Sequence, residues 1–267
     1  MSADLNILQI ISGALVGLLV GLTGVGGGSL MTPVLILLLG VPPLTAVGTD
    51  LWFAAITKSV ASRWFYQKGL IDWAVVRALW TGSLPTATIA LLVIGLFGAS
   101  IQLPSLTKQL VGIAVLLSGV GLLWQVRRQM LIRRLQRDPE HITFGELTKR
   151  QWAYTVTLGA VVGLLVTLSS IGAGALGMVV LTALYHRRLS ARHLIATDIV
   201  HAVPLTAFAG LGHWFLGDIQ YSLLWNLLIG SVPAVLLGSW LATRLPQLWL
   251  RLILCIVLWL VAAKLMA

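Results

Sequence analysis

The sequence predicts an all-α, multi-pass membrane protein made of two inverted repeats, each a broken re-entrant helical hairpin followed by three transmembrane helices. Three observations lead to this prediction: the composition, an internal repeat and the distribution of basic residues. Of the 267 residues, 58% are hydrophobic and only 10% are charged, and the mean hydropathy is +0.96. Soluble domains carry about 25% charged residues, so most of this surface is expected to face lipid.

Apolar runs near the membrane-spanning length of about 20 residues recur along the chain. Examples are 84–99, 110–126, 223–242 and 250–263. The opening segment MSADLNILQI lacks the basic region and cleavage site of a secretory signal peptide, so the first apolar run is expected to belong to the mature fold. The formal net charge of +10 comes mainly from short stretches between the runs, which favours membrane orientation over nucleic-acid binding.

The chain contains an internal repeat. The segment 17-GLLVGLTGVGGGSLM matches 163-GLLVTLSSIGAGALG at an offset of 146 residues, and 48-GTDLWFAA matches 196-ATDIVHAV at an offset of 148. The pairs 69-GLIDW with 217-GDIQY and 82-GSLP with 230-GSVP continue at the second offset. We therefore expect a first transmembrane repeat over 1–126 and a second over 151–267, joined by a basic linker over 127–150.

Each repeat is expected to contain a leading apolar stretch, a glycine-rich break, a short apolar segment and three long spans. The short segment of the first repeat, 29–39, would be about 16 Å long as a helix, roughly half the hydrocarbon core. If it re-enters as a hairpin with the preceding stretch, each repeat crosses three times and the repeats are inverted. If both pieces cross, each repeat crosses four times and the repeats are parallel.

The positive-inside rule decides between these two arrangements. In the inverted arrangement 15 basic residues are cytoplasmic, and only Lys108 and Lys264 are outside. The parallel arrangement has 11 inside and 6 outside, because the 187-RRLSAR stretch, Arg244 and Arg251 move outside and Lys264 moves inside. The sequence thus predicts a cytoplasmic linker, both termini outside, and the inverted repeats of secondary transporters.

The break 21-GLTGVGGGSL does not match a phosphate-binding loop of a soluble enzyme, because G-x-G-x-x-G spacing and G-K-[ST] are both lacking. Irregular backbone is tolerated at membrane depth where it lines a cavity or is covered by protein. A short helix beginning at each break would direct its free N–H groups and positive dipole end toward the break, which favours an anion. Glycines that only allow close helix packing are the alternative.

Hydroxyl groups beside each break can donate hydrogen bonds to an oxyanion, or bond locally within a helix. Lys58 can supply positive charge to an anion, pair with an acid, or extend toward the membrane surface. The predicted substrate-binding residues are Thr23, Gly24, Gly26, Gly27, Gly28, Ser29, Lys58, Ser169, Ser170, Gly172 and Gly174. The sequence predicts no metal site and no cofactor.

Asp50 and Asp198 occupy equivalent positions in the two repeats, each near the expected start of a long span. An acid at membrane depth costs about 2.5 to 3.5 kcal/mol, which favours a function, whereas a helix N-cap is the alternative. His201 follows Asp198 by three residues on the same helix face, and it can carry a proton near neutral pH or act as a packing residue. These three residues are the candidates for proton coupling or gating.

The segments GLTGVGGGSLMTPVLILLLGVPPLTAVGTDLW and KGLIDW of the first repeat, with ATDIVHAVPLTAFAGLGHWFLGDI and LLIGSVPAVLLGSWLA of the second, resemble the TauE/SafE sulfite exporter family. This family is also called the toluene sulfonate uptake permease family. The resemblance covers nearly the whole chain except the basic linker. It implies a carrier of small sulfur-containing anions in the bacterial inner membrane, generally an exporter.

The predicted function is therefore a secondary transporter of sulfite or organosulfonates, with the substrate bound at the membrane midplane between the two breaks. Its expected partners are a small anionic substrate, membrane lipids and a coupling proton or ion, without nucleic acid. A passive anion channel is one alternative. An intramembrane aspartyl hydrolase using Asp50 and Asp198 is another, but helix starts in opposite leaflets are expected to keep these carboxyl groups apart.

Overall fold

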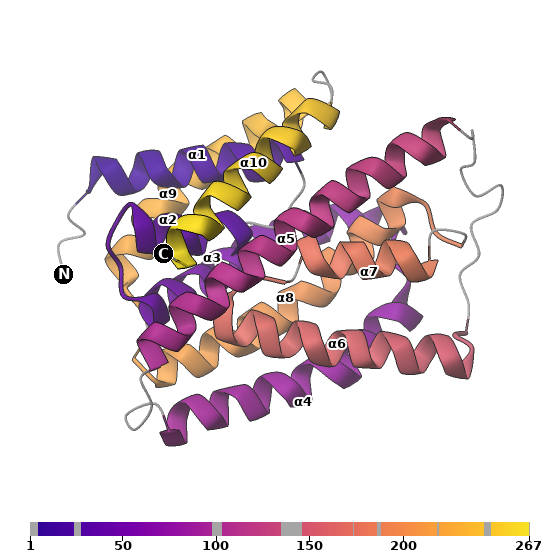
Figure 1. The fold of residues 1–267 in the computed structure, drawn as a ribbon, viewed down its shortest axis with the longest axis horizontal. Helices are drawn as coiled ribbons and strands as arrows, with labels where there is room; N and C mark the ends of the chain where they lie inside the picture. The colour runs from indigo at the N-terminus through magenta and orange to yellow at the C-terminus, as the bar shows by residue number, and fades with distance from the viewer. Residues whose placement is uncertain are drawn as a thin grey trace.

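A computed structural model of the chain describes residues 5–23, 28–97, 103–134, 146–172, 174–185, 188–217, 219–242 and 247–266. Within these residues all regular structure is α-helical (Figure 1). The first half contains α1 Ile7–Thr23, α2 Gly28–Leu37, α3 Pro43–Gln67, α4 Trp73–Phe97 and α5 Leu103–Arg134. The second contains α6 Lys149–Ser169, α7 Ala175–Tyr185, α8 Ala191–Phe215, α9 Tyr221–Ala242 and α10 Gln247–Met266.

The two halves share one element order: a long helix, a short helix and three long helices. The short helices α2 and α7 have 10 and 11 residues, so each is about half as long as a hydrocarbon core is thick. The prediction of a short segment over 29–39 is confirmed by α2, which begins one residue earlier and ends two residues earlier.

Local capping explains where some of the helices begin. The Asp72 carboxyl accepts hydrogen bonds of 3.0 and 3.2 Å from two backbone N–H groups in the first turn of α4. Thr148 and Gln151 form a capping box at the start of α6. At the N-terminal end of the predicted linker, α5 continues to Arg134. The helical part of the first repeat therefore extends beyond the predicted boundary at residue 126.

Glycines allow two pairs of helices, α1 with α9 and α4 with α6, to pack at backbone distance. A Cβ atom added at these glycines would collide with the main chain of the neighbouring helix. The contacts are Gly13 with Leu227, Gly17 with Ser231, Gly159 with Leu79 and Gly163 with Ser83. Each α1–α9 contact has a counterpart between α6 and α4 at the repeat offset. The glycine belongs to the first half in the α1–α9 contacts and to the second half in the α6–α4 contacts. Small residues at such contacts are typical of helix association in membranes.

The equivalent helices α3 and α8 pack against each other and run antiparallel. Near the start of α3, the Thr49 hydroxyl accepts a 3.3 Å hydrogen bond from the backbone N–H of Gln220, which lies just after α8. Near the start of α8, the Thr197 hydroxyl accepts a 3.1 Å bond from the backbone N–H of Asp72, which lies just after α3. The two bonds are again related by the repeat offset.

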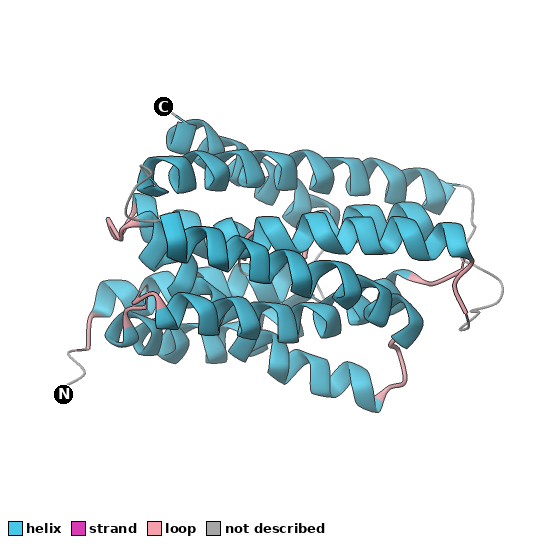
Figure 2. Ribbon diagram, turned by 90° about the horizontal axis from the view of Figure 1, so that it is seen from below, coloured by secondary structure: helices cyan, strands magenta, loops and turns pink. Residues whose placement is uncertain are grey.

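The outer surface of the bundle is apolar. In the part of the chain that the structure describes, four stretches are long and apolar enough to cross a membrane: Trp73–Leu96, Lys149–Ser169, Arg192–Phe215 and Tyr221–Gly238. Large apolar side chains point outward from these helices; Phe215 is 87% exposed and Leu96 is 73% exposed. Figure 2 shows the helices lying side by side along the bundle. This arrangement is typical of a multi-pass membrane protein.

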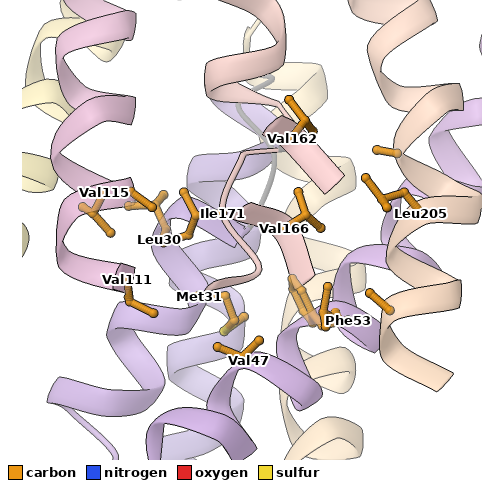
Figure 3. Close-up of a cluster of buried hydrophobic side chains, with 14 of the residues drawn as sticks. Leu30, Met31, Val47, Phe53, Val111, Val115, Val162, Val166, Ile171 and Leu205 are labelled. Atoms are coloured by element: carbon orange, nitrogen blue, oxygen red, sulfur yellow. The ribbon is translucent and has the colours of Figure 1, made fainter. Parts of the chain in front are cut away.

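A buried apolar cluster joins the two halves where the breaks occur. Leu30 of α2 and Ile171, which follows α6, belong to this cluster together with Val115 of α5. Figure 3 shows Leu30 and Ile171 lying together beside Val115. The two breaks are therefore close to each other in the interior.

Candidate functional site

The first break is described only on its flanks. The predicted ligands that lie outside the described residues are Gly24, Gly26, Gly27 and the side chain of Thr23. Gly28 is the first residue of α2, and Ser29 is buried in the first turn of this helix. The N-terminus of α2 therefore lies at the glycine-rich break, as the sequence predicts.

The second break has an unusual backbone that explains two of its glycines. Gly172 and Gly174 have φ values of 135° and 131°, which residues with a side chain rarely adopt. Their carbonyl groups accept hydrogen bonds of 3.0 Å from Gly177 and 3.2 Å from Met178 at the start of α7. The glycines thus allow the chain to leave α6 and begin α7 within a few residues.

The structure separates the roles of the two adjacent serines. The Ser169 hydroxyl is used locally, because it donates to the Leu165 carbonyl at 2.6 Å and accepts from the Ile171 N–H at 3.2 Å. Ser170 has φ of 58°, so the chain turns sharply at this residue. Its hydroxyl is buried and has no partner within hydrogen-bonding geometry. Of the pair, Ser170 is the one with an available hydroxyl.

Asp50 lies in the interior, next to both breaks. Its side chain is fully buried, and its Oδ2 accepts a 2.5 Å hydrogen bond from the Thr32 hydroxyl of α2. The Ser170 hydroxyl from the second half also interacts with this carboxyl, although neither Ser170 Oγ nor Asp50 Oδ1 meets strict hydrogen-bonding geometry with any group. One carboxyl group thus faces hydroxyls from both halves of the chain.

Lys58 connects Asp50 to the acid of the second half. Lys58 is 7% exposed and Asp198 is 3% exposed. Lys58 interacts electrostatically with both carboxyl groups, more strongly with Asp198 than with Asp50. One face of Asp198 lies directly against Gly177, where a Cβ atom would meet the carboxyl oxygen Oδ1. Asp198 thus lies against the start of α7 and within electrostatic range of Lys58.

His201 completes the buried polar cluster formed by Asp50, Lys58, Ser170 and Asp198. Its Nε2 shares a 3.0 Å hydrogen bond with the Ser83 hydroxyl of α4, and Lys58 acts on it electrostatically. The position of α8 that is equivalent to Lys58 holds Thr206, whose hydroxyl bonds the Ala202 carbonyl of its own helix at 2.9 Å. The cluster is therefore asymmetric in charge, although the backbone around it repeats.

The structure corrects one expectation about the acids. Asp50 and Asp198 lie well inside α3 and α8, which begin at Pro43 and Ala191, so neither residue caps the start of its helix. Lys58 acts electrostatically on both carboxyl groups. The prediction failed because the helices begin earlier than the polar TD pairs suggest. Asp50 nevertheless makes no hydrogen bond to Asp198, so the paired carboxyls of an aspartyl hydrolase are not formed.

The buried polar cluster is closed to solvent. Its side chains are at most 7% exposed. A groove of about 540 Å³ lies elsewhere, at the start of α1 beside α9, where Asn6, Gln9 and Asn226 line it. An apolar groove of about 290 Å³ lies between α4 and α8. Neither groove is lined by a residue of the cluster.

An ion pair near the cluster was not anticipated from the sequence. Arg188 Nη2 lies 2.9 Å from Asp72 Oδ2, and both side chains are mostly buried. The pair joins the turn between α7 and α8 to the turn between α3 and α4. At the opposite end of the antiparallel pair, the residue equivalent to Asp72 is the neutral Gln220. The excess of basic residues in 187-RRLSAR was the available signal, but it was interpreted only as a mark of orientation.

The chain is similar to a family of exporters and to known membrane transporters. The family model "Sulfite exporter TauE/SafE" matches residues 9–265. The chain is 38% identical over 243 residues to the "Probable membrane transporter protein YjnA" of Bacillus subtilis (strain 168), covering 90% of this chain and 91% of that protein. It is 25% identical to the "Probable membrane transporter protein YdhB" of the same organism, covering 89% and 90% of the two chains. No solved structure matches.

Proposed function

The chain belongs to the TauE/SafE sulfite exporter family and is a multi-pass membrane transporter, not an enzyme; on this premise we propose that it carries small sulfur-containing anions, such as sulfite or an organosulfonate, by alternating access. The substrate would bind near the membrane midplane, between the two breaks. The proposed location is the bacterial inner membrane. The proposed direction of transport is export, and the ion gradients across the membrane set this direction.

One observation carries this proposal: both halves contribute to a single buried polar cluster beside the breaks. Ser170 of the second half acts on Asp50 of the first, and Lys58 of the first acts on Asp198 of the second. Charged groups at membrane depth are costly and are retained mainly where they serve transport. A cluster shared between two halves can be opened to either side when the halves move relative to each other.

We propose further that the two halves are inverted repeats with respect to the membrane. The antiparallel packing of α3 and α8 supports this, because parallel repeats would direct these equivalent helices the same way. The exchanged glycine contacts of α1 with α9 and α4 with α6 support the same two-fold relationship. The short lengths of α2 and α7 are consistent with re-entrant hairpins.

The chemistry of the cluster suits an oxyanion. The ammonium group of Lys58 can attract it, and the Ser170 hydroxyl can donate a hydrogen bond to it. The N-termini of the short helices α2 and α7 each direct the positive end of a helix dipole toward a break. The closed state of the cluster favours a carrier over a passive anion channel, because a channel requires a continuous open path.

The test is sulfite flux into proteoliposomes, with sulfate, thiosulfate and sulfoacetate as competitors, with and without a pH gradient. We expect saturable, gradient-driven movement of sulfite or of one competitor. Gly174→Leu should reduce this flux at least tenfold, because φ near 131° excludes a side chain beside α7.

Gly69→Leu is the matched control, because Gly69 also has positive φ, at 64°, but its missing side chain would meet open space. The control should retain transport. Flux that does not saturate and ignores the gradient would indicate a channel. Wild-type flux that Gly174→Leu leaves unchanged would remove the substrate site from the second break.

A further inference from the structure

A stack of side chains between α4 and α8 connects the buried polar cluster to the end of the bundle at which both helices begin. On α4 the stack runs from Asp72 through Val76 and Trp80 to Ser83, and these spacings place the four residues on one helix face. Ser83 shares its hydrogen bond with His201 of the cluster. At a rise of 1.5 Å per residue, Asp72 and Ser83 are about 16 Å apart along the helix, roughly half the thickness of a hydrocarbon core.

The outermost layer of the stack is the ion pair of Asp72 and Arg188. The two side chains are 2% and 16% exposed, and their charged groups are 2.9 Å apart. Arg188 belongs to the turn that leads into α8, whereas Asp72 caps α4. The Thr197 hydroxyl of α8 also accepts a 3.1 Å hydrogen bond from the backbone N–H of Asp72. The start of α8 therefore cannot move away from the start of α4 unless both contacts break.

An apolar layer lies one helical turn further toward the cluster. Val76 of α4 packs with Ala196 and Val200 of α8 in a small core cluster of its own, and these side chains are at most 9% exposed. Trp80 packs against this layer, and its Nε1 donates a 3.1 Å hydrogen bond to the His201 carbonyl. An ion cannot pass such a layer while it is closed, because apolar side chains do not solvate a charge.

The equivalent stack at the opposite end, between α9 and α3, is neutral. The hydrogen bond from the backbone N–H of Gln220 to the Thr49 hydroxyl recurs there, but Gln220 replaces Asp72. The segment equivalent to the turn of Arg188, 39-LGVPP-43, contains no charged residue. At the repeat offset of 148, the other equivalents are apolar: Leu224 for Val76, Leu228 for Trp80 and Phe53 for His201. The two ends, which we call the Asp72 end and the Gln220 end, are therefore closed by different chemistry.

We propose that the ion pair of Asp72 and Arg188 holds closed a gate between α4 and α8, through which the anion reaches the buried polar cluster at the Asp72 end. This inference rests on the proposed alternating access and identifies the barrier on one side. An ion pair suits this role, because opening the gate admits water that solvates the separated charges. In the proposed topology the Asp72 end faces the cytoplasm, since α4 and α5 each cross the membrane once before the basic linker.

The test measures access to each end without substrate. The lone Cys255 is replaced by alanine, and one cysteine is then introduced, either Val76→Cys behind the ion pair or Leu224→Cys at the equivalent position of the Gln220 end. Both positions are at most 8% exposed, and cysteine fits there as a smaller, weakly polar side chain. A charged, membrane-impermeant methanethiosulfonate is added to inside-out and right-side-out membrane vesicles, and the rate of thiol labelling is measured.

Arg188→Gln and Asp72→Asn each remove the ion pair, and asparagine keeps an oxygen to cap α4. We expect each variant to label Val76→Cys at least tenfold faster from the Asp72 end, without faster labelling of Leu224→Cys from the Gln220 end. A population shift toward one open state does not favour the other. The two changes combined should label no faster than the faster single variant. Arg192→Gln is the control, because Arg192 is an exposed arginine near the same turn, and it should change neither rate.

Unchanged labelling of Val76→Cys in both variants would overturn the proposal. Faster labelling at both ends would also overturn it, because the ion pair would then stabilise the whole bundle and not one gate. Sulfite flux in the same variants separates the gate from the proposed substrate. If sulfite does not move but labelling changes as expected, the gate stands and the substrate is wrong; if sulfite is transported and neither rate changes, transport stands and the gate is wrong.

Discussion

Asp50 and Asp198 are equivalent in sequence but differ in their surroundings. Asp50 faces the hydroxyls of Thr32 and Ser170, whereas Asp198 faces Lys58 and the main chain at Gly177. The difference follows from several departures between the repeats: Met178 is equivalent to Thr32, Gly24 to Ser170, and Thr206 to Lys58. A repeated backbone with different side chains thus gives the two acids different surroundings.

Gly177 controls the position of the Asp198 carboxyl group. We expect Gly177→Ala to reduce sulfite transport at least tenfold, because the new methyl group would displace this carboxyl from its place in the buried polar cluster. The cost to the free energy of unfolding should be only about 1 to 3 kcal/mol, the usual range for overpacking. Transport assays combined with thermal unfolding in detergent measure the two effects.

Gly95→Ala is the control for this change, because a Cβ atom there would make an ordinary 3.5 Å contact with Leu216 Cδ2. It should leave transport intact. Equal transport by Gly177→Ala and Gly95→Ala would mean that the position of the Asp198 carboxyl group is unimportant.

At the scale of helices, the order of elements could be predicted from the sequence, but their contacts could not. The short helices and the breaks are local features, since glycine clusters and hydropathy report them directly. The start of α3 was misjudged because the polar Thr49–Asp50 pair imitates a cap, although the helix begins at Pro43. The role of Thr49 depends on Gln220, a partner far away in sequence, so no local pattern could reveal it.

The ion pair of Arg188 and Asp72 fastens one end of the antiparallel pair α3 and α8. Removing Arg188 should cost about 2 kcal/mol, less than the 3 to 5 kcal/mol of a fully buried pair, because two backbone N–H groups also stabilise Asp72. A double-mutant cycle with Arg188→Gln and Asp72→Asn isolates the pair, since asparagine preserves the cap of α4.

The expected coupling free energy of this cycle is about 1 to 3 kcal/mol, measured by thermal unfolding in detergent. Gln220→Ala, at the equivalent position of the other end, should have little effect, because its bond to Thr49 uses the backbone. Additive effects of Arg188→Gln and Asp72→Asn would show that the contact contributes nothing as a pair.

For the whole molecule, the exchanged contacts explain why neither half is expected to fold as an independent domain. The glycine faces of α1 and α6 pack against α9 and α4, which belong to the opposite halves. The antiparallel pair α3 and α8 also crosses between halves. The predicted division at 1–126 and 151–267 is therefore a division of sequence, and the helices of the two parts are interleaved in space.

This interleaving requires a definite membrane topology. With three crossings and one re-entrant hairpin per half, the C-terminus lies on the side opposite to the basic linker; with four crossings per half, both lie on the same side. We expect alkaline phosphatase fused after Ala267 to be active, since this enzyme works outside the cytoplasm, and green fluorescent protein there to remain dark. A reporter inserted after Arg134 should give the reverse result, because the basic linker is held inside by its charge. Fluorescence at both positions would indicate parallel repeats, and the antiparallel packing of α3 and α8 could then not exist in the membrane.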